Sequence, residues 1–170
     1  EYSEGLGAPN ALDLARDRND IVVLRTFSKV YGLAALRLGW VYAPMEIAEN
    51  LNRVRLPFTI NGMAQAAGVA ALEDTNHTDM VLSHTHSWLP KLSDKLNGLG
   101  LEPLPSVGNF VTVRFPNPKK SAKMAQAYLE SHNIIPRTAA DYGMPEFLRI
   151  SVGLEEENLA LISTLEDFLD

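Results

Sequence analysis

Cysteine is absent from the 170-residue sequence, and its absence excludes several kinds of site. Without a thiol, the chain can form no disulfide bond, no thiolate nucleophile and no zinc site with cysteine ligands. The absence is also consistent with a cytoplasmic protein, which is the location that we expect. No apolar run approaches the roughly 20 residues that cross a bilayer, so we expect no membrane partner.

Positive charge is scarce as well. The sequence has 15 lysine and arginine residues against 21 aspartate and glutamate residues, which gives a formal net charge of −6. Because nucleic acid is bound by a basic face, we do not expect DNA or RNA to be a partner of this acidic chain. An initiator methionine is also absent, and the sequence opens in a polar, glycine-containing stretch. We therefore expect it to be a piece of a longer chain.

The histidines lack the spacing of a metal site. His84 and His86 lie two residues apart in a stretch with a helical pattern, where their side chains point to different sides. Zinc ligands on one helix prefer a spacing of four residues. The sequence also contains no P-loop, no nucleophile elbow and no dinucleotide fingerprint. We therefore expect no metal site.

The first part of the sequence alternates short apolar runs with helical patterns. Residues 21–27 (IVVLRTF) form a near-continuous apolar run, which predicts a buried strand of the parallel kind, covered on both faces. A second strand is expected at 38–43, and a helix is expected to begin at Pro44. An alanine-rich helix follows at 62–74. This order is typical of the end of a mostly parallel α/β sheet.

The second part has the pattern of an α+β unit, in which helices cover one small sheet. We place the boundary between the two domains after residue 75, so that they comprise residues 1–75 and 76–170. The apolar periodicity predicts helices at 79–99, 121–133 and 154–170, and strands at 109–115, 134–137 and 147–153.

The stretch TFSKVYGLAALRLGW, residues 26–40, places a lysine directly after the first predicted strand. A partly desolvated lysine loses its proton readily and becomes a nucleophilic amine suited to Schiff-base chemistry. Ser28 adds a hydroxyl beside Lys29, and Arg37 adds a fork of donors that matches a phosphate. Taken singly, such residues are usually solvated loop residues. Together they are the set that pyridoxal phosphate, a phosphorylated aldehyde, requires.

The whole pattern T-x-S-K-x-x-G-x-A-x-x-R-x-G resembles the lysine segment of the fold type I, pyridoxal-phosphate-dependent aminotransferases, most closely the histidinol-phosphate aminotransferase group. The resemblance implies an α/β fold, with the end of the large, mostly parallel sheet domain followed by the C-terminal α+β small domain. Three later stretches are similar to segments of this family in the expected order: RLPFTINGMAQAAGVAAL (55–72), SVGNFVTVRF (106–115) and IIPRTAADYGMPEFLRISVG (134–153).

The resemblance also implies roles around the cofactor, pyridoxal 5'-phosphate. Lys29 matches the lysine that holds the cofactor covalently and moves a proton between the substrate Cα and the cofactor. Ser28 and Arg37 match residues that bind the cofactor phosphate, and Thr26 assists them. Tyr2 matches a tyrosine that hydrogen-bonds the ring oxygen, with an unstructured terminal residue as the alternative interpretation.

Three further residues match positions at the substrate. Arg149 matches the arginine that clamps the α-carboxylate, for which a planar guanidinium is well suited. Arg137 matches an arginine at the substrate's distal end, and Asn109 matches a position near the carboxylate. The alternatives are structural: an ion pair between Arg149 and Glu146 or a cap on a sheet edge, a surface cation at Arg137, and a turn-ending side chain at Asn109.

Several family features have no counterpart in the sequence. The aspartate that pairs with the pyridinium nitrogen would fall just before Glu1, and the family's phosphate loop and ring-stacking aromatic are missing. We therefore expect that the fragment alone does not catalyse transamination. Two other aromatic residues, Tyr31 and Tyr142, are expected to be packing residues, with stacking on the cofactor or the substrate as the alternative.

The resemblance implies transamination in histidine biosynthesis: L-histidinol phosphate and 2-oxoglutarate would give imidazole-acetol phosphate and L-glutamate. Two enzymatic alternatives remain open, a threonine-phosphate decarboxylase-like reaction and transamination of aromatic amino acids. A third alternative is the aminotransferase-like effector domain of a transcription regulator. The family also implies a homodimer, because the site of this fold is usually completed across a subunit interface.

Overall fold

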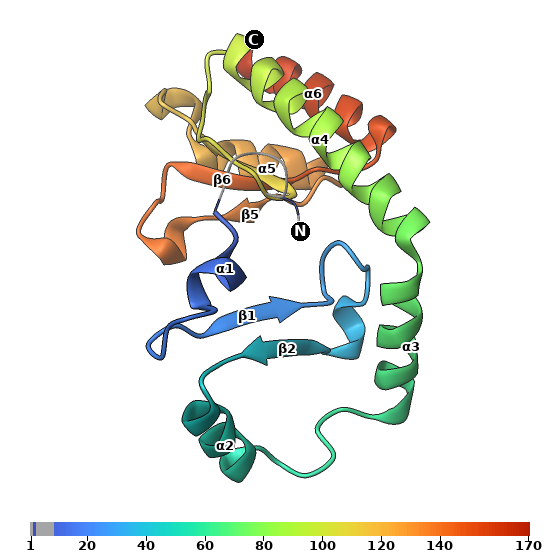
Figure 1. Ribbon diagram of the computed structural model, residues 1–170. Helices are drawn as coiled ribbons and strands as arrows, with labels where there is room; N and C mark the ends of the chain where they lie inside the picture. The colour runs from blue at the N-terminus through green and yellow to red at the C-terminus, as the bar shows by residue number, and fades with distance from the viewer. Residues whose placement is uncertain (1, 3–8) are drawn as a thin grey trace. The chain divides into compact units, whose positions relative to one another are not determined.

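The computed structural model describes Tyr2 and residues 9–170 (Figure 1). The described residues form two compact units, which are treated separately below. Residues 9–82 make up the first unit, and Tyr2 joins residues 83–170 in the second. The division falls inside helix α4 (Thr75–Gly98), the helix at whose start the sequence places the domain boundary.

The first unit contains a two-stranded sheet, three α-helices, a 3-10 helix (Ala34–Leu36) and the first part of α4. The strands β1 and β2 are antiparallel, and their register runs from Val23 opposite Tyr42 to Thr26 opposite Gly39. The elements are α1 (Ala11–Ala15), β1 (Val23–Thr26), β2 (Gly39–Tyr42), α2 (Met45–Val54) and α3 (Gly62–Glu73).

Two details predicted for the first strand are wrong in this chain. The neighbour of β1 is antiparallel rather than parallel, and the strand is not covered on both faces, since Leu24 is 77% exposed. All four residues of β2 are exposed as well. The physical reason is that the sheet has only two strands among the described residues, so its apolar side chains lack neighbours.

Helix α3 packs closely against the connection between the two strands. The Asn61 side chain caps the helix by accepting a hydrogen bond from the backbone N–H of Ala64 (2.9 Å). A Cβ added at Gly68 would lie 2.4 Å from Cδ2 of Leu38. Glycine therefore allows the helix to approach the connection more closely than any other residue would.

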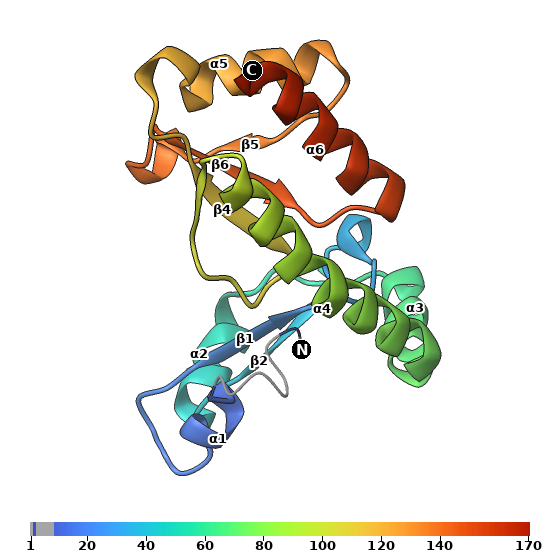
Figure 2. The same cartoon turned by 90° about the horizontal axis from the view of Figure 1, so that it is seen from above.

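The second unit is an antiparallel sheet of four strands in the order β3-β4-β6-β5, covered by helices. Figure 2 shows α5 and α6 on the same side of β5 and β6. Besides α4, the elements are β3 (Glu102–Pro103), β4 (Phe110–Arg114), α5 (Ala122–Ser131), β5 (Arg137–Thr138), β6 (Phe147–Ser151) and α6 (Glu155–Leu169).

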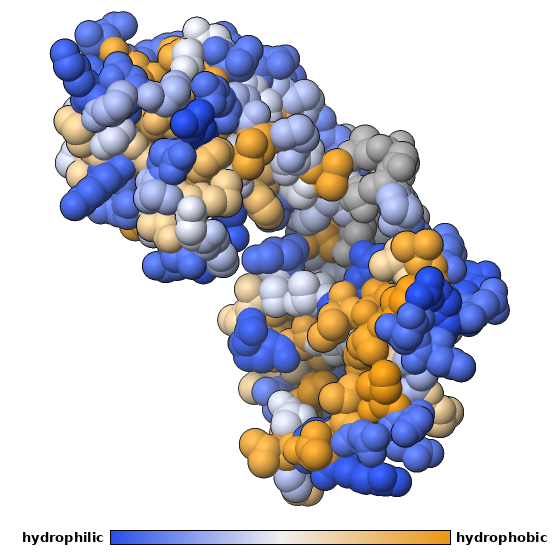
Figure 3. Space-filling view, turned by 90° about the vertical axis from the view of Figure 1, so that its left-hand side faces the viewer, coloured by the Kyte–Doolittle hydropathy of each residue, from blue (hydrophilic) through white to orange (hydrophobic). Residues whose placement is uncertain are grey.

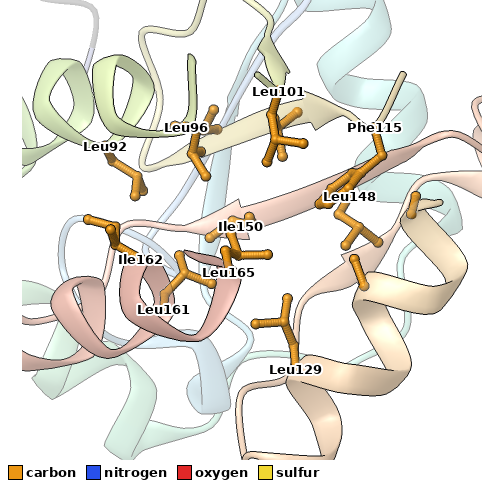
Figure 4. Packing of buried hydrophobic residues seen from close by; sticks show 14 of the residues in the cluster. Leu92, Leu96, Leu101, Phe115, Leu129, Leu148, Ile150, Leu161, Ile162 and Leu165 are labelled. Carbon is orange, nitrogen blue, oxygen red and sulfur yellow. The ribbon is translucent and has the colours of Figure 1, made fainter. Parts of the chain in front are cut away.

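The core of the second unit lies between the sheet and its three helices (Figure 4). Alternation along β4 and β6 sends every second side chain into this core, which leaves Arg149 and its neighbours on the other face. The strand residues of the core are Val111, Val113, Leu148 and Ile150, and the helix residues include Leu92, Leu96, Leu129, Leu161 and Leu165.

The sequence predicts most of these elements, with two errors in the second unit. The strand expected at 134–137 is instead the short β5, Arg137–Thr138, because Pro136 has no backbone N–H to donate to a ladder. The two-residue strand β3 was not expected in the Gly- and Pro-rich stretch. Among the described residues, no helix has the length and apolar character needed to cross a membrane.

Candidate active site

The connection between β1 and β2 carries the residues expected around the cofactor. The backbone N–H of Phe27 donates to the carbonyl of Leu38 (3.0 Å), which extends the ladder one pair beyond the strands. Residues 28–37 therefore form a loop closed at its base. Ser28 and Arg37 are the first and last residues of this loop, so the fold brings them to the same end of the ladder.

The Ser28 side chain is oriented by Thr26. The Thr26 hydroxyl donates to Oγ of Ser28 (2.8 Å), and it accepts a hydrogen bond from the Ser28 backbone N–H (3.0 Å). A hydroxyl can accept from one group and donate to another. Ser28 Oγ, acting as an acceptor here, thus keeps its own proton for an anion.

Arg37 has an unusual backbone conformation. Its φ of +53° lies in the left-handed region, which costs a residue with a side chain about 1–2 kcal/mol. One end of the guanidinium donates to the carbonyl of Ala34 (2.7 Å). The side chain forms no ion pair with any described residue, so no carboxylate of the described residues neutralises its charge.

Lys29 is exposed between two buried residues, Phe27 and Val30. The backbone of the loop is fixed on both sides of it: the carbonyl of Lys29 accepts from the N–H of Gly32 (2.9 Å), which has a φ of +68°. Nζ of Lys29 has no hydrogen bond or ion pair to the part of the chain that the structure describes. The loop thus carries a primary amine on the residue that follows the Ser28 hydroxyl.

In the second unit, the fold pairs the two arginines expected at the substrate. Arg137 on β5 lies directly opposite Arg149 on β6. Both line a cavity of about 240 Å³ whose wall also includes Ser151, Glu157 and Asn158. The sequence assigns each arginine a role but does not predict that they are cross-strand neighbours.

Neither arginine is neutralised by a carboxylate of the described residues. The Arg149 guanidinium lies over the ring of Phe110, 5.0 Å from its centroid. Arg137 lies 5.6 Å from the ring centroid of Tyr142 and donates to the Tyr142 hydroxyl (2.8 Å). The alternative partner of Arg149, Glu146, is paired with Arg114 instead.

Asn109 and Tyr2 have backbone contacts that place them in the second unit. The carbonyl of Asn109 accepts from the N–H of Val152 (2.9 Å), which continues the β4–β6 ladder by one residue. The carbonyl of Tyr2 accepts from Nε2 of His86 on α4 (2.8 Å). The roles of both residues at the cofactor and the substrate stay predictions.

Sequence reasoning missed two polar residues near the cavity. Asn158 is only 1% exposed, and its side chain amide forms two hydrogen bonds of 2.9 Å with the backbone of Gly153. His84 donates from Nε2 to the same carbonyl (2.8 Å). The acidic start of α6 marks a helix in the sequence, but nothing in it indicates the bonds of Asn158 to Gly153 or the long-range contact of His84. The described residues hold no cluster that could bind a metal ion.

The prediction for the two tyrosines is half right. Tyr31 packs its ring against Phe27, with the centroids 4.9 Å apart. Tyr142 is 61% exposed and contacts Arg137 instead of packing in the core, so the expected packing role is wrong for it.

Comparisons with known proteins cover nearly the whole chain. The model of the family "Aminotransferase class I and II" matches residues 2–164. The chain is 45% identical to a histidinol-phosphate aminotransferase of Maricaulis maris, over 99% of this chain and 48% of the relative. A second relative of this name, from Caulobacter vibrioides, is 43% identical with the same coverage. The chain thus spans about half the length of the curated relatives it matches.

Solved structures give the same result for the fold. A histidinol-phosphate aminotransferase of Sinorhizobium meliloti, in complex with pyridoxal-5'-phosphate, is 28% identical with a TM-score of 0.82, over 90% of this chain and 42% of that chain. An L-threonine-O-3-phosphate decarboxylase of Porphyromonas gingivalis, at 24% identity and a TM-score of 0.76, shares the fold over 95% of this chain and 50% of that chain. The expected fold type I class is confirmed, and the chain belongs to the aminotransferase class I and II family.

Proposed function

We propose that this chain is the C-terminal half of a pyridoxal-phosphate-dependent histidinol-phosphate aminotransferase. The observation that supports the proposal is the loop at residues 28–37, which begins and ends at one ladder and carries an amine, a hydroxyl and a guanidinium without an ion pair to the described residues. Identity of 42–45% to relatives of that name supports the choice of reaction.

The residues of the loop fit the cofactor. Ser28 would donate its free hydroxyl proton to the phosphate, and Thr26 would hold that hydroxyl in place. Arg37 would supply the positive charge, and its strained backbone is the kind of feature that persists at ligand sites. Bound pyridoxal phosphate supplies a covalent attachment point and an electron sink, and Lys29 Nζ takes the proton from the substrate Cα and later returns one.

The two arginines of the cavity fit the anionic groups of the two substrates. Arg149 would bind a carboxylate with two parallel N–H donors, as in the keto-acid acceptor. Arg137 would bind the phosphate of histidinol phosphate, which has no carboxylate, and Asn109 would contact the carboxylate of the acceptor or orient Arg149. The support for this assignment is that both guanidinium groups lack a carboxylate partner within the described residues.

The chain alone would be inactive under this proposal. The aspartate that pairs with the pyridinium nitrogen and the phosphate loop have no counterpart in the sequence, and the chain spans about half of its curated relatives. Tyr2 would complete the ring-oxygen contact. Residues 1–75 would be the end of the large domain and residues 76–170 the small domain.

We further propose that the complete protein is a cytoplasmic homodimer. The first unit exposes many large apolar side chains, which Figure 3 shows as a continuous patch on its surface. Phe58 is 97% exposed with a φ of +56°, a costly conformation for a bulky residue. Exposed apolar patches usually mark an interaction surface, which here would face the rest of the complete chain and a second subunit. Sedimentation of the complete protein tests the dimer, and imaging of a tagged protein tests the location.

The reaction is tested by giving the complete protein histidinol phosphate and 2-oxoglutarate with pyridoxal phosphate. The proposal predicts that L-glutamate forms, and that unphosphorylated histidinol and aromatic amino acids are poorer donors. Release of carbon dioxide from threonine phosphate, without glutamate, would point to the decarboxylase alternative. Absence of all three activities would contradict an enzymatic role.

A further inference from the structure

Three arginines lie on the face of the second unit's sheet that points away from the core, and their partners differ. Arg114 forms ion pairs with Glu102 (3.1 Å) and Glu146 (3.6 Å). Arg149 and Arg137 rest on aromatic rings and have no carboxylate partner within the described residues. The sheet therefore contains one neutralised arginine and two that keep their full charge.

An aromatic ring holds a guanidinium differently from a carboxylate. A carboxylate cancels the positive charge, whereas a ring attracts the cation through its quadrupole and leaves the net charge in place. The Tyr142 hydroxyl adds direction, because it accepts one N–H of Arg137 and leaves the other N–H donors unused. Tyr142 can thus fix Arg137 without reducing its attraction for an anion.

The backbone that carries Tyr142 is itself fixed to the sheet. Its N–H donates to the carbonyl of Ala139 (3.0 Å), and Gly143 closes the turn with a φ of +76°. Ala139 is buried, and its own N–H donates to the carbonyl of Phe147 on β6 (3.2 Å). The tyrosine therefore stays exposed beside Arg137, although no core contact requires an aromatic residue there.

We propose that Tyr142 is a positioning residue for Arg137 and thereby sets the preference for a substrate with a doubly charged phosphate group. The proposal rests on the proposed function, since it assigns to Arg137 the phosphate of the substrate. Tyr142 orients the guanidinium by its hydroxyl and its ring. Binding of a dianion then requires no reordering of the arginine side chain and no release from a carboxylate.

The first test compares Tyr142→Phe with Tyr128→Phe in the complete enzyme. Tyr128 is the matched control, because its ring packs on Phe168 in the same unit and its hydroxyl has no hydrogen bond to a described residue. Tyr142→Phe is expected to raise KM for histidinol phosphate about 5- to 10-fold, a part of what a hydrogen bond to a charged group contributes. The value of kcat and the KM of an unphosphorylated aromatic donor should stay within about twofold. Equal changes for both donors, or none, would overturn the proposal.

The second test needs neither cofactor nor turnover. Inorganic phosphate is titrated into residues 1–170, and the Nε–Hε signal of Arg137 is followed by NMR, with Arg137→Lys to assign it. Phosphate should shift this signal in the wild type and in Tyr128→Phe, with an apparent Kd about 5-fold weaker in Tyr142→Phe. If phosphate leaves the signal unmoved, or if Tyr142→Phe binds as the wild type does, Tyr142 does not position Arg137. This result is independent of whether the complete protein transaminates histidinol phosphate, so the two proposals fail separately.

Discussion

The two units of the chain bury their apolar residues to very different extents. The second unit encloses a core of leucine, valine and isoleucine from three helices and two strands, whereas the first unit buries few large side chains and leaves Leu24, Leu56 and Phe58 in solvent. Burial of apolar surface is the main source of stability. The unit with the loop around Lys29 is therefore expected to be the less stable of the two toward unfolding.

The largest expected effect comes from cutting a core side chain in the second unit. Leu165→Ala should lower the free energy of unfolding of that unit by about 3–4 kcal/mol, because Leu165 is fully buried. Leu24→Ala in the first unit should change its stability by less than about 0.5 kcal/mol. The two tryptophans, Trp40 and Trp88, lie in different units, so urea unfolding followed by fluorescence of single-tryptophan variants measures each one. Equal losses of unfolding free energy from the two substitutions would contradict the difference in stability between the units.

The next effect separates the roles of the sheet's arginines. Arg137→Ala should raise KM for histidinol phosphate about 30-fold in the complete enzyme, which corresponds to about 2 kcal/mol, and change KM for an unphosphorylated aromatic donor far less. The control is Arg114→Ala, whose guanidinium is already paired with Glu102 and Glu146. Steady-state kinetics with both donors decides the matter. An equal rise in KM for both donors would contradict the proposal that Arg137 binds the phosphate.

A smaller effect is expected where α3 meets the loop of the first unit. Gly68→Ala places a Cβ 2.4 Å from Leu38 Cδ2, the flexible end of a side chain, and should destabilise this unit by about 1–2 kcal/mol. Gly62→Ala is the control in the same helix, because a Cβ there meets nothing within 4 Å. Trp40 fluorescence during urea unfolding gives both values. A neutral Gly68→Ala would mean that the close approach is not needed.

The smallest effect belongs to an exposed ion pair of the first unit. The hydrogen bond from Arg18 lowers the pKa of Asp20 below its ordinary value of 3.8. A lowered pKa adds stability above the unfolded-state pKa, and this stability is lost as the pH falls through the folded-state pKa. Asp20→Asn should therefore change the midpoint of unfolding only slightly at pH 7 and not at all near pH 2. Thermal melts at both pH values measure the difference.

The sequence predicts the helices of the second unit better than its strand pairing. The periodicity of Ala122, Ala125 and Leu129 correctly identifies the buried face of α5. The apolar run before Arg137 suggests a longer strand than β5, although Pro136 is itself a local signal against a strand, because it has no N–H to donate. Register is a long-range property, so the Arg137–Arg149 pair could not be predicted.

The candidate site also has one part that the sequence predicts and another part that it does not. The motif around Lys29 is contiguous in sequence, and its residues do lie in one loop. The contacts of Tyr142, His84 and Asn158 join segments that are distant along the chain or lie in turns, and no pattern indicates them. Exposure of β1 was also unpredictable, since an apolar run does not reveal how many neighbouring strands are present.

The central claim is that Lys29 holds pyridoxal phosphate covalently. The most direct measurement treats the complete protein and its Lys29→Ala variant with the cofactor, reduces both with borohydride, and maps the peptides by mass spectrometry. The account predicts a reduced cofactor adduct on the peptide with Lys29 in the wild type, and none in the variant. An adduct on another lysine, or the same cofactor binding by both proteins, would contradict it.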